Sequence, residues 1–265
     1  MKSNSVEGPA ARIVSLAPSA TSILCEIGAQ SSLVGVTKWC ADVAPVKHLL
    51  RFGDCWRLDS VDKILRLRPT LIIGSVPFRA ETVAKLLERP LRFLAINPRR
   101  ISDIYDDIRL LARITRRERD GERLILRMEK EFQLLRARST PSCSSFPPRV
   151  YSEAWPNPRI SSPPWVAELI EICGGRMTVP AGTRVSDPDV ASARPEIIVL
   201  AWTATGSKAD PRKAYSVAAW KEVPAIQTRR VRVIRDELLN TPGPPLLEGA
   251  RQLYRIIHSS AGAKV

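Results

Sequence analysis

The stretch from Arg12 to Cys40, RIVSLAPSATSILCEIGAQSSLVGVTKWC, constrains the fold more than any other part of this chain. It begins with a short apolar, β-prone run, Ile13 to Leu16, which Pro18 ends because proline cannot donate to a strand ladder. A second apolar run follows at Leu33 to Val36. Two strands separated by one helix-length segment are typical of a parallel α/β unit.

The segment between these two strands predicts a helix that runs to Ile27. Ser19 is a candidate N-cap for this helix, with Thr21 and Ser22 as alternatives. Gly28 stands where a helix favours a left-handed residue after its last turn. The sequence therefore predicts a strand, a helix and a strand in that order.

Ligands bind at the carboxyl ends of parallel strands. In this unit those ends lead into Ala17-Pro18-Ser19 after the first strand and into Lys38-Trp39 after the second. We therefore expect Ser19, Lys38 and Trp39 to lie at one edge of the sheet.

The same alternation continues through most of the chain. In the first half, Asp59 or Ser60 caps a predicted helix that Pro69 stops. Further strands are predicted at residues 71–74, 91–96, 149–152, 197–201 and 231–234, and further helices at 61–67, 80–88, 165–173 and 246–257. Such alternation favours parallel sheets with helices on their faces.

A different pattern separates the two halves. Apolar residues recur at helical spacing from Ile101 to about Arg138, and Gly121 interrupts them without ending the pattern. We expect one long helix, kinked near Gly121. Residues 139–148, STPSCSSFPP, have the composition of a linker.

The two halves also resemble each other. Arg68 to Ile73 aligns with Arg194 to Val199, and Arg12 to Ser15 aligns with Arg149 to Ser152. Because the order is the same in both halves, we expect two related α/β lobes. The predicted boundaries are 12–100 for the first lobe, 101–138 for the bridging helix and 149–265 for the second lobe.

Size and charge exclude several classes of protein. A hydrophobic content of 44% over 265 residues is that of a globular protein, and no apolar run reaches the roughly 18 residues that span a membrane. The formal charge of +14 is compatible with nucleic-acid binding. The arginines, however, are spread along the chain beside acidic residues, and the cluster Arg229-Arg230-Val231-Arg232 contains no aromatic residue. We expect no nucleic-acid partner.

Motifs for metal binding and catalysis are not found. The five cysteines (Cys25, Cys40, Cys55, Cys143 and Cys173) contain no CxxC pair, and His48 and His258 are the only histidines. Nucleotide-binding glycine loops, GxSxG and HExxH do not occur. We therefore expect no enzyme, no metal site and no catalytic cofactor. Cys40 and Cys55 are candidate neighbours at the rim of a cleft.

The tryptophans are the informative chemical feature. Four of them, Trp39, Trp56, Trp155 and Trp202, follow predicted strands, while Trp165 lies near a helix end. A single tryptophan often only covers the edge of a core. Four tryptophans that follow equivalent strands in two lobes favour a shared aromatic cleft. Such a cleft suits a large, flat, partly apolar ligand.

Several of these segments resemble a known family. RIVSLAPSATSIL, LVGVTKWC, FGDCWRLDSVDKILRLRPTLII, WVAELIEICGG, RPEIIVLAW and NTPGPPLLEGARQL are similar to the vitamin B12-binding solute-binding proteins of ABC transporters, over Arg12 to His258. These proteins have two α/β lobes bridged by a long helix, of the type called class III. The resemblance implies a ligand cleft between two Rossmann-like lobes.

The resemblance also implies roles for individual residues. Trp39 matches an aromatic that flanks the ligand, Trp56 matches a tryptophan that follows the first-lobe loop, and Asp62 matches an acidic position that docks on arginines of a permease. In the second lobe the sequence departs from the pattern: Asn240 stands at the expected acidic position and Leu238 or Leu239 at the expected aromatic. The candidate ligand-binding residues are Ser19, Lys38, Trp39, Trp56, Phe78, Trp155, Trp165, Trp202, Leu238 and Asn240.

The expected function is therefore non-catalytic binding of cobalamin or a related corrinoid by a monomer, with an ABC permease as partner. Two alternatives stay open, which are a haem or ferric-siderophore binding protein on the same fold, and a cytoplasmic enzyme or regulatory module that reuses the scaffold. For localisation, the family implies the periplasm, whereas the first eleven residues lack the apolar segment of a secretory signal, which favours the cytoplasm.

Overall fold

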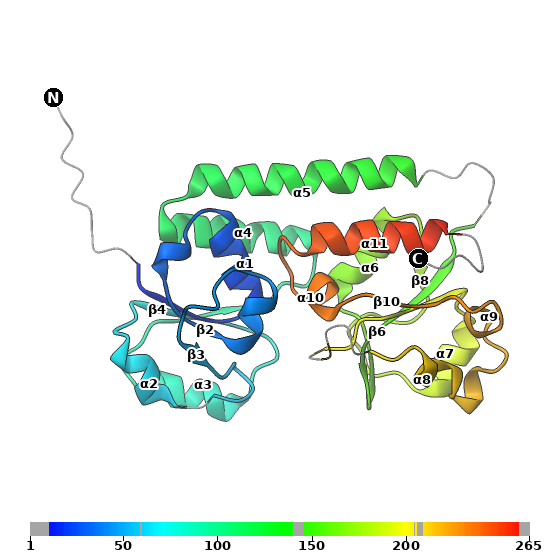
Figure 1. Ribbon diagram of the computed structural model, residues 1–265, viewed down its shortest axis with the longest axis horizontal. Coiled ribbons are helices and arrows are strands. Elements are labelled where there is room, and N and C mark those ends of the chain that lie inside the picture. The colour runs from blue at the N-terminus through cyan, green and yellow to red at the C-terminus, as the bar shows by residue number, and fades with distance from the viewer. Residues whose placement is uncertain (1–10, 59, 140–145, 204, 206–208, 260–265) are drawn as a thin grey trace. The chain divides into compact units, whose positions relative to one another are not determined.

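The chain divides into two compact units (Figure 1). The computed structural model describes residues 11–58, 60–139, 146–203, 205 and 209–259. Unit 1 consists of Met1–Pro98 and Ile104–Ile125, and unit 2 of Arg99–Asp103 and Leu126–Val265. Each unit is built on its own five-stranded sheet.

Unit 1 contains a parallel sheet with the strand order β3-β2-β1-β4-β5. Its strands are β1 (Ile13–Leu16), β2 (Leu33–Thr37), β3 (Arg51–Phe52), β4 (Leu71–Ser75) and β5 (Phe93–Ile96). The central strand β1 is completely buried, which agrees with its continuous apolar sequence because such a strand has helices on both faces.

The helices of unit 1 cover both faces of this sheet. They are α1 (Pro18–Glu26), α2 (Val61–Arg66) and α3 (Ala80–Leu87), together with the parts of α4 (Ile101–Thr115) and α5 (Glu118–Arg138) that lie within Ile104–Ile125. Figure 1 shows α1 and α4 on one face and α2 and α3 on the other. The core under α2 and α3 includes Val14, Leu16, Phe52, Ile64 and Leu86.

The N-terminal end of α1 differs from the prediction, whereas its C-terminal end agrees with it. Ser19 does not cap the helix, because the N-cap is Ala17, with Pro18 as the first helical residue. Proline suits that position since its missing N–H would have no partner within the helix. At the other end Gly28 has a φ of 73°, as its place in the sequence predicts.

The predicted single helix over residues 101–138 is wrong. The structure has two helices, α4 (Ile101–Thr115) and α5 (Glu118–Arg138), and Arg116 between them has a φ of 57°. The break therefore lies before Gly121, which is inside α5. A Cβ at Gly121 would stand 2.6 Å from the Cβ of Ala112, so this glycine allows α4 and α5 to approach each other closely.

Unit 2 contains a mixed sheet with the order β10-β9-β6-β7, and β8 also pairs with β6. Its strands are β6 (Arg149–Pro156), β7 (Arg159–Ser161), β8 (Arg176–Met177), β9 (Ile197–Leu200) and β10 (Val231–Val233). Strands β6 and β7 form an antiparallel hairpin, and the other pairs are parallel. Strand β6 is longer than predicted because the hairpin extends it beyond Ser152.

Helices again cover both faces of the unit 2 sheet. Figure 1 shows α6 and α11 on one face and α7, α8 and α9 on the other. The bounds are α6 (Pro164–Ile172), α7 (Asp187–Ala193), α8 (Arg212–Tyr215), α9 (Pro224–Gln227), α10 (Asp236–Leu239) and α11 (Leu246–His258). The core under α7 to α9 is built around Tyr151 and Trp220, whose rings meet edge to face with centroids 6.0 Å apart.

The internal repeat predicted from the sequence is visible in backbone contacts. Arg12 directly precedes β1, and Arg149 is the first residue of β6. The carbonyl oxygen of each accepts a hydrogen bond of 2.8 Å, from the amides of Thr70 and Glu196 respectively. The two guanidinium groups donate to the C-terminal ends of α2 and α7. The prediction of two related α/β lobes is therefore confirmed.

The helix caps repeat as well. Ser60 is the N-cap of α2 and accepts from the amide of Lys63, while Ser186 is the N-cap of α7 and accepts from the amide of Asp189. Asp59, the alternative cap of α2, lies outside the described residues, as do Cys143 and most of the predicted linker. Among the helices that the structure describes, none is long and apolar enough to cross a lipid bilayer.

Candidate functional site

The first group of candidate residues lies at the carboxyl ends of β1 and β2. Strand β1 leads into α1, where Ser19 is almost completely buried, and β2 leads into a short 3₁₀ helix, Lys38–Asp42. The Lys38 ammonium lies 4.4 Å from the centroid of the half-buried Trp39 ring. The structure therefore brings Ser19, Lys38 and Trp39 to the same edge of the unit 1 sheet.

A cluster of buried polar side chains lies next to this edge of the sheet. The Thr21 hydroxyl lies 2.8 Å from the Ser15 hydroxyl and 3.0 Å from the Cys40 sulfur, and Thr37 contacts the same sulfur at 3.2 Å. Burial raises the pKa of the Cys40 thiol, so this sulfur is held as a neutral thiol. These contacts join α1 to the end of β2 and fix the backbone that carries Lys38 and Trp39.

Trp56 is the most exposed tryptophan of unit 1, with 53% of its surface accessible. Asp54 accepts hydrogen bonds from the amides of Trp56 and Arg57, at 2.9 and 2.8 Å, so the turn is held by its own side chain. The Arg79 guanidinium lies 5.6 Å from the Trp56 ring centroid. An exposed indole beside a cation can stack on a flat ligand while the cation meets an anionic substituent.

Phe78 stands next to Arg79 in the loop after β4. It is partly buried and packs edge to face on Phe93 with centroids 6.3 Å apart. The amide of Arg79 donates to the Cys55 carbonyl at 3.1 Å, which joins the Phe78 loop to the Trp56 loop. Phe78 and Trp56 therefore come from neighbouring loops of unit 1.

In unit 2, Trp155 is the exposed aromatic of the candidate set. It lies near the end of β6, at the tip of the β6–β7 hairpin, and 40% of its surface is accessible. Its indole N–H donates to the Asn157 carbonyl at 2.9 Å. The ring is thus held in one orientation while its faces stay available.

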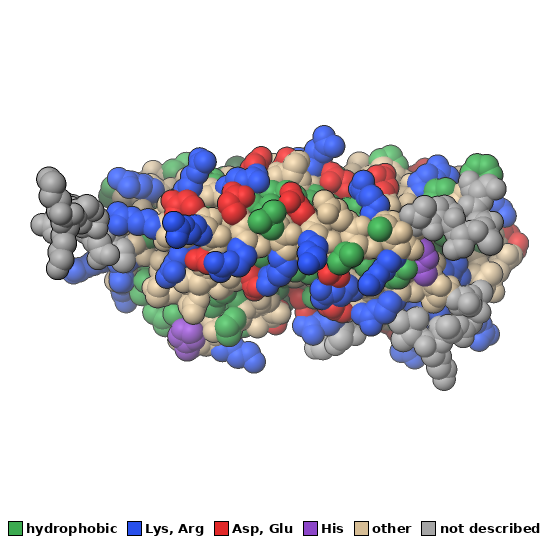
Figure 2. Space-filling model, turned by 90° about the horizontal axis from the view of Figure 1, so that it is seen from above, with side chains coloured by type: hydrophobic (Ala, Val, Ile, Leu, Met, Phe, Trp, Pro, Cys, Tyr) green, Lys and Arg blue, Asp and Glu red, His purple; other side chains and the backbone are tan. Residues whose placement is uncertain are grey.

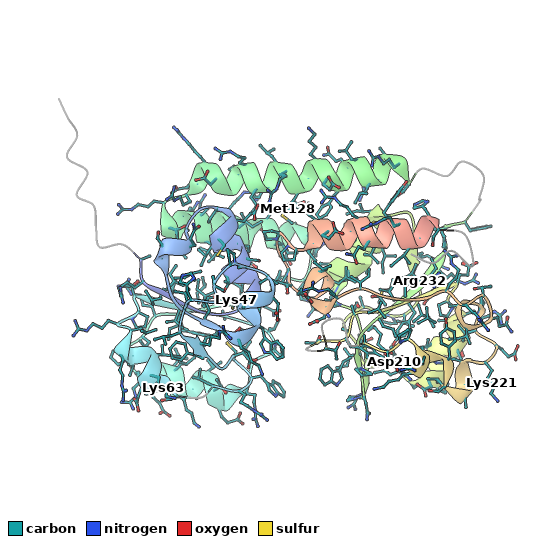
Figure 3. The ribbon with its side chains drawn as sticks, viewed as in Figure 1. Lys47, Lys63, Met128, Asp210, Lys221 and Arg232 are labelled. Atoms are coloured by element: carbon teal, nitrogen blue, oxygen red, sulfur yellow. The ribbon has the colours of Figure 1, made fainter. Side chains whose placement is uncertain are left out.

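Trp165 and Trp202 are buried in unit 2. Trp165 is 6% exposed and its N–H donates to the Leu239 carbonyl at 2.9 Å, while Trp202 is 4% exposed and its N–H donates to Glu153 at 2.7 Å. Lys213 lies 5.5 Å from the Trp202 ring centroid. The neighbouring Arg212 donates to Asp210, which Figure 3 labels in unit 2. Both indoles therefore pack in the core, and ligand contact by either one stays a prediction.

The last candidates of unit 2 lie in and just after α10. The Asn240 side chain donates to the Ala201 carbonyl at 2.6 Å and lies 3.3 Å from the Thr203 hydroxyl. Leu238 is half-buried, and its carbonyl lies where a Cβ at position 249 would stand, which only glycine permits. Asn240 therefore joins α10 to the segment that follows β9.

The docking candidate Asp62 is exposed in the first turn of α2. Its carboxylate accepts a hydrogen bond from the guanidinium of Arg89, 3.3 Å away. Both groups are more than half exposed, so the pair contributes little to stability. The face of the molecule in Figure 2 shows basic and acidic side chains interspersed rather than a field of one sign.

Glu153 directly follows the strand predicted at residues 149–152, a position from which its carboxylate could reach a ligand or form a salt bridge. Its side chain has no accessible surface and accepts hydrogen bonds from Tyr151, Arg159 and Trp202. The sequence offered one signal, a carboxylate that follows an apolar run, but its partners come from distant segments. In the part of the chain that the structure describes, no three His, Cys, Asp or Glu side chains gather as they would around a metal ion.

Comparisons with known proteins agree with this architecture. The family described as periplasmic binding protein matches residues 13–238. The vitamin B12-binding protein of Vibrio cholerae serotype O1 is 27% identical over 257 residues, which are 92% of this chain and 88% of that protein. An uncharacterized ABC transporter substrate-binding lipoprotein, YvrC of Bacillus subtilis, is 24% identical over 93% of this chain and 80% of its own length.

Solved structures show the same fold. The periplasmic vitamin B12 binding protein BtuF of Vibrio cholerae has a TM-score of 0.75 at 24% identity, covering 94% of this chain and 97% of that chain. The periplasmic haem-binding protein HutB of Vibrio cholerae has a TM-score of 0.78 at 19% identity, covering 94% and 99%. The predicted fold, two parallel-sheet α/β lobes of the class III type, is confirmed, and so is the resemblance to vitamin B12-binding proteins.

Proposed function

Because this chain belongs to the periplasmic binding protein family, we propose that it captures cobalamin or a related corrinoid, without chemistry on it, and presents it to an ABC permease. One observation carries the proposal. Trp56 and Trp155 are exposed near the strand ends of their units, although the large side chain of tryptophan is usually mostly buried. Contact with the apolar face of a macrocycle would bury such a ring.

The polar neighbours of these rings suit the edge of such a ligand. Lys38 and Arg79 accompany Trp39 and Trp56, and both cations can donate to the amide oxygens of a corrin ring or to carboxylates. In unit 2 the candidate ligand-binding residues are Trp155, Trp202, Leu238 and Asn240. Trp165, with its N–H engaged inside the unit, is the weakest member of the set.

The experiment is a titration of the pure protein with cyanocobalamin, followed by tryptophan fluorescence and by the visible spectrum of the corrin. We expect saturable quenching at micromolar ligand, and a loss of about tenfold or more in affinity for Trp56→Ala and for Trp155→Ala. Phe146→Ala is the matched control, since Phe146 is also an exposed aromatic but precedes β6 at the opposite end of the strand. No saturable change in the wild type contradicts the corrinoid assignment.

Haem is the second candidate ligand. The observation in its favour is the pair of cations at the unit 1 edge, because haem carries carboxylates whereas the amide side chains of cobalamin are neutral. Titration with haemin under the same conditions separates the two. Tighter binding of haemin, lost on Lys38→Gln and Arg79→Gln, identifies haem as the ligand.

The partner and the compartment belong to the same proposal. The Bacillus subtilis relative is named a lipoprotein and the Vibrio cholerae structures are named periplasmic, which supports a role outside the inner membrane with Asp62 on the docking surface. Pull-down of a permease complex by the wild type and not by Asp62→Arg tests this role. Equal recovery with both forms contradicts it.

A further inference from the structure

Unit 2 contains a carboxylate that is completely enclosed by protein. The Glu153 side chain has no accessible surface, yet it lies near the end of β6, two residues before the exposed Trp155. A buried carboxylate is costly unless it is paired with a cation and both of its oxygens accept hydrogen bonds. Three short hydrogen bonds meet this requirement here.

The three donors come from three different places in the unit. Oε2 accepts from the Tyr151 hydroxyl at 2.6 Å and from Nη1 of Arg159 at 2.9 Å, and Oε1 accepts from the indole N–H of Trp202 at 2.7 Å. Tyr151 lies on the same strand, Arg159 on β7, and Trp202 just after β9. One carboxylate therefore joins the hairpin strand to the segment that leaves the neighbouring strand.

Arg159 extends this connection to the helix layer. Its Nε donates to Asp187, the first residue of α7, and its guanidinium lies 4.3 Å from the centroid of the buried Trp220 ring. The Trp220 N–H in turn donates to the Asp187 carbonyl at 3.0 Å. The guanidinium is thus held on three sides, and only 16% of the side chain is exposed.

The hairpin that carries Trp155 depends on this anchor. The β6–β7 register shifts between Glu153 and Trp155, which is the signature of a bulge that re-aims a side chain. Arg159 pairs with Pro156 across the hairpin, directly beside Trp155. A tether from Arg159 back to Glu153 therefore fixes the strand opposite the exposed indole.

The corresponding place in unit 1 has no such carboxylate. The alignment of Arg12 to Ser15 with Arg149 to Ser152 places Leu16 opposite Glu153, and Leu16 packs in an apolar core. The fold of a unit can therefore be completed without a charge at this position. This difference points to a role for Glu153 other than completing the α/β core.

We propose that Glu153 is the positioning residue of the ligand-facing edge of unit 2. By holding Arg159 and Trp202 together, it fixes the orientation of the Trp155 hairpin and of the segment after β9 before ligand arrives. The inference rests on the proposed function, because only there does Trp155 contact ligand. Preorganisation of this kind lowers the entropy that binding would otherwise lose.

Glu153→Gln tests the proposal with a change of minimal size. The amide can keep its oxygen toward Tyr151 and Arg159, but its NH₂ group then faces the N–H of Trp202, so two donors oppose each other. The variant removes one contact of the anchor while conserving shape. Glu131→Gln is the matched control, since Glu131 accepts from Arg251 at 2.7 Å in the same unit and contacts neither β6 nor β7 in any described hydrogen bond.

The readout is ¹⁹F NMR of the chain labelled with 5-fluorotryptophan, which gives a signal for each of the six tryptophans. Trp→Phe variants assign the signals. In Glu153→Gln we expect the Trp155 and Trp202 signals to shift or broaden, while those of Trp165 and of the two unit 1 tryptophans stay in place. Affinity for cyanocobalamin or haemin should fall about tenfold or more, and Glu131→Gln should change neither.

The outcomes that overturn the proposal are distinct from those that overturn the function. An unchanged Trp155 signal in Glu153→Gln, or a changed signal with unchanged affinity, refutes the positioning role. A wild type that binds neither cyanocobalamin nor haemin refutes the proposed function, and the ¹⁹F signals still decide whether Glu153 orients the hairpin. If Glu153→Gln does not fold, Arg159→Lys replaces it, because an ammonium keeps the charge but cannot reach Glu153 and Asp187 together. The same shift of the Trp155 signal is then expected.

Discussion

Arg68 and Arg194 hold the same left-handed backbone conformation, with φ angles of 47° and 46°, at equivalent places in the two units. Arg68 follows the C-cap of α2 before β4, and Arg194 is the C-cap of α7 before β9. Each is followed by a proline. Apart from asparagine and aspartate, L-residues rarely adopt this conformation, because the Cβ approaches the following carbonyl oxygen. The two units thus share a strained connection as well as a topology.

Replacing Arg68 by glycine is therefore expected to stabilise the protein. Removal of the Cβ relieves the left-handed strain, and the gain exceeds the entropy that glycine adds to the unfolded chain, so the free energy of unfolding should rise by about 0.5 kcal/mol. Urea denaturation measures it. Arg66→Gly, at the last residue of α2, is the control and should lose up to about 1 kcal/mol, because this residue has no left-handed strain to relieve. A loss at both positions contradicts the strain.

Gly121→Ala should destabilise the protein although alanine favours helices. The new Cβ would stand 2.6 Å from the Cβ of Ala112, so α4 and α5 must move apart, at a cost of about 1–3 kcal/mol. The control is Leu126→Ala on the same helix, where the side chain is 63% exposed and the change should be small. Thermal unfolding distinguishes the two. Stabilisation by Gly121→Ala would show that the helices are not in close contact.

Trp165→Phe should lower stability and leave ligand affinity unchanged. The substitution removes the N–H that the Leu239 carbonyl accepts at 2.9 Å and leaves this carbonyl buried without that donor, which costs about 1–2 kcal/mol. Chemical denaturation and the cyanocobalamin titration are measured on the same preparation. A weaker affinity at unchanged stability would instead assign Trp165 to the ligand surface.

Cys173 should make the stability of the fold depend on alkaline pH. Burial raises the pKa of its thiol to about 12, whereas the thiol of an unfolded chain titrates near 8.5. The folded state thus keeps a proton that the unfolded state loses. Its stabilising effect is complete below pH 8.5 and declines as the pH rises toward 12.

Comparison with Cys173→Ala isolates this effect from other alkaline titrations. At pH 10 the wild type should have lost about 1–2 kcal/mol more than the variant, relative to pH 7. Urea denaturation at both pH values provides the measurement. Parallel curves for the two proteins would mean that the thiol titrates normally in the folded state.

The main elements of the fold follow from the sequence because apolar runs of four or more residues mark buried parallel strands. The sequence does not predict the short strands β3, β7 and β8, which have two or three residues each and begin with arginine. Such segments are too short to show an apolar run or an alternation of apolar and polar residues. The break at Arg116 was missed for another reason. Nothing in a sequence marks an arginine that will adopt a left-handed conformation, as Arg116 does. Gly121 suggested a kink at its own position, but the structure shows that this glycine instead allows close contact with Ala112.

The candidate site was predictable only in part. The pattern predicts Trp39, Trp56 and Trp155 after strands. Trp39 follows β2 and Trp56 follows β3, whereas Trp155 lies inside β6, which extends beyond the predicted strand. Whether a tryptophan is exposed depends on partners far away in the chain, as for Trp202, whose N–H donates to Glu153 across 49 positions of sequence. Such pairs become visible only when the strands are assembled.

The enclosed carboxylate of Glu153 has a consequence for how this protein can acquire a new ligand. At the unit 1 edge, Lys38 and Trp56 can each be exchanged singly, because each is exposed and joined to its surroundings by one described ring contact. At the unit 2 edge, a change of Glu153 leaves Arg159, Tyr151 and Trp202 in conflict, so these positions must change together. We expect that selection for altered ligand specificity changes the unit 1 edge by single substitutions. The four connected residues at the unit 2 edge should stay unchanged.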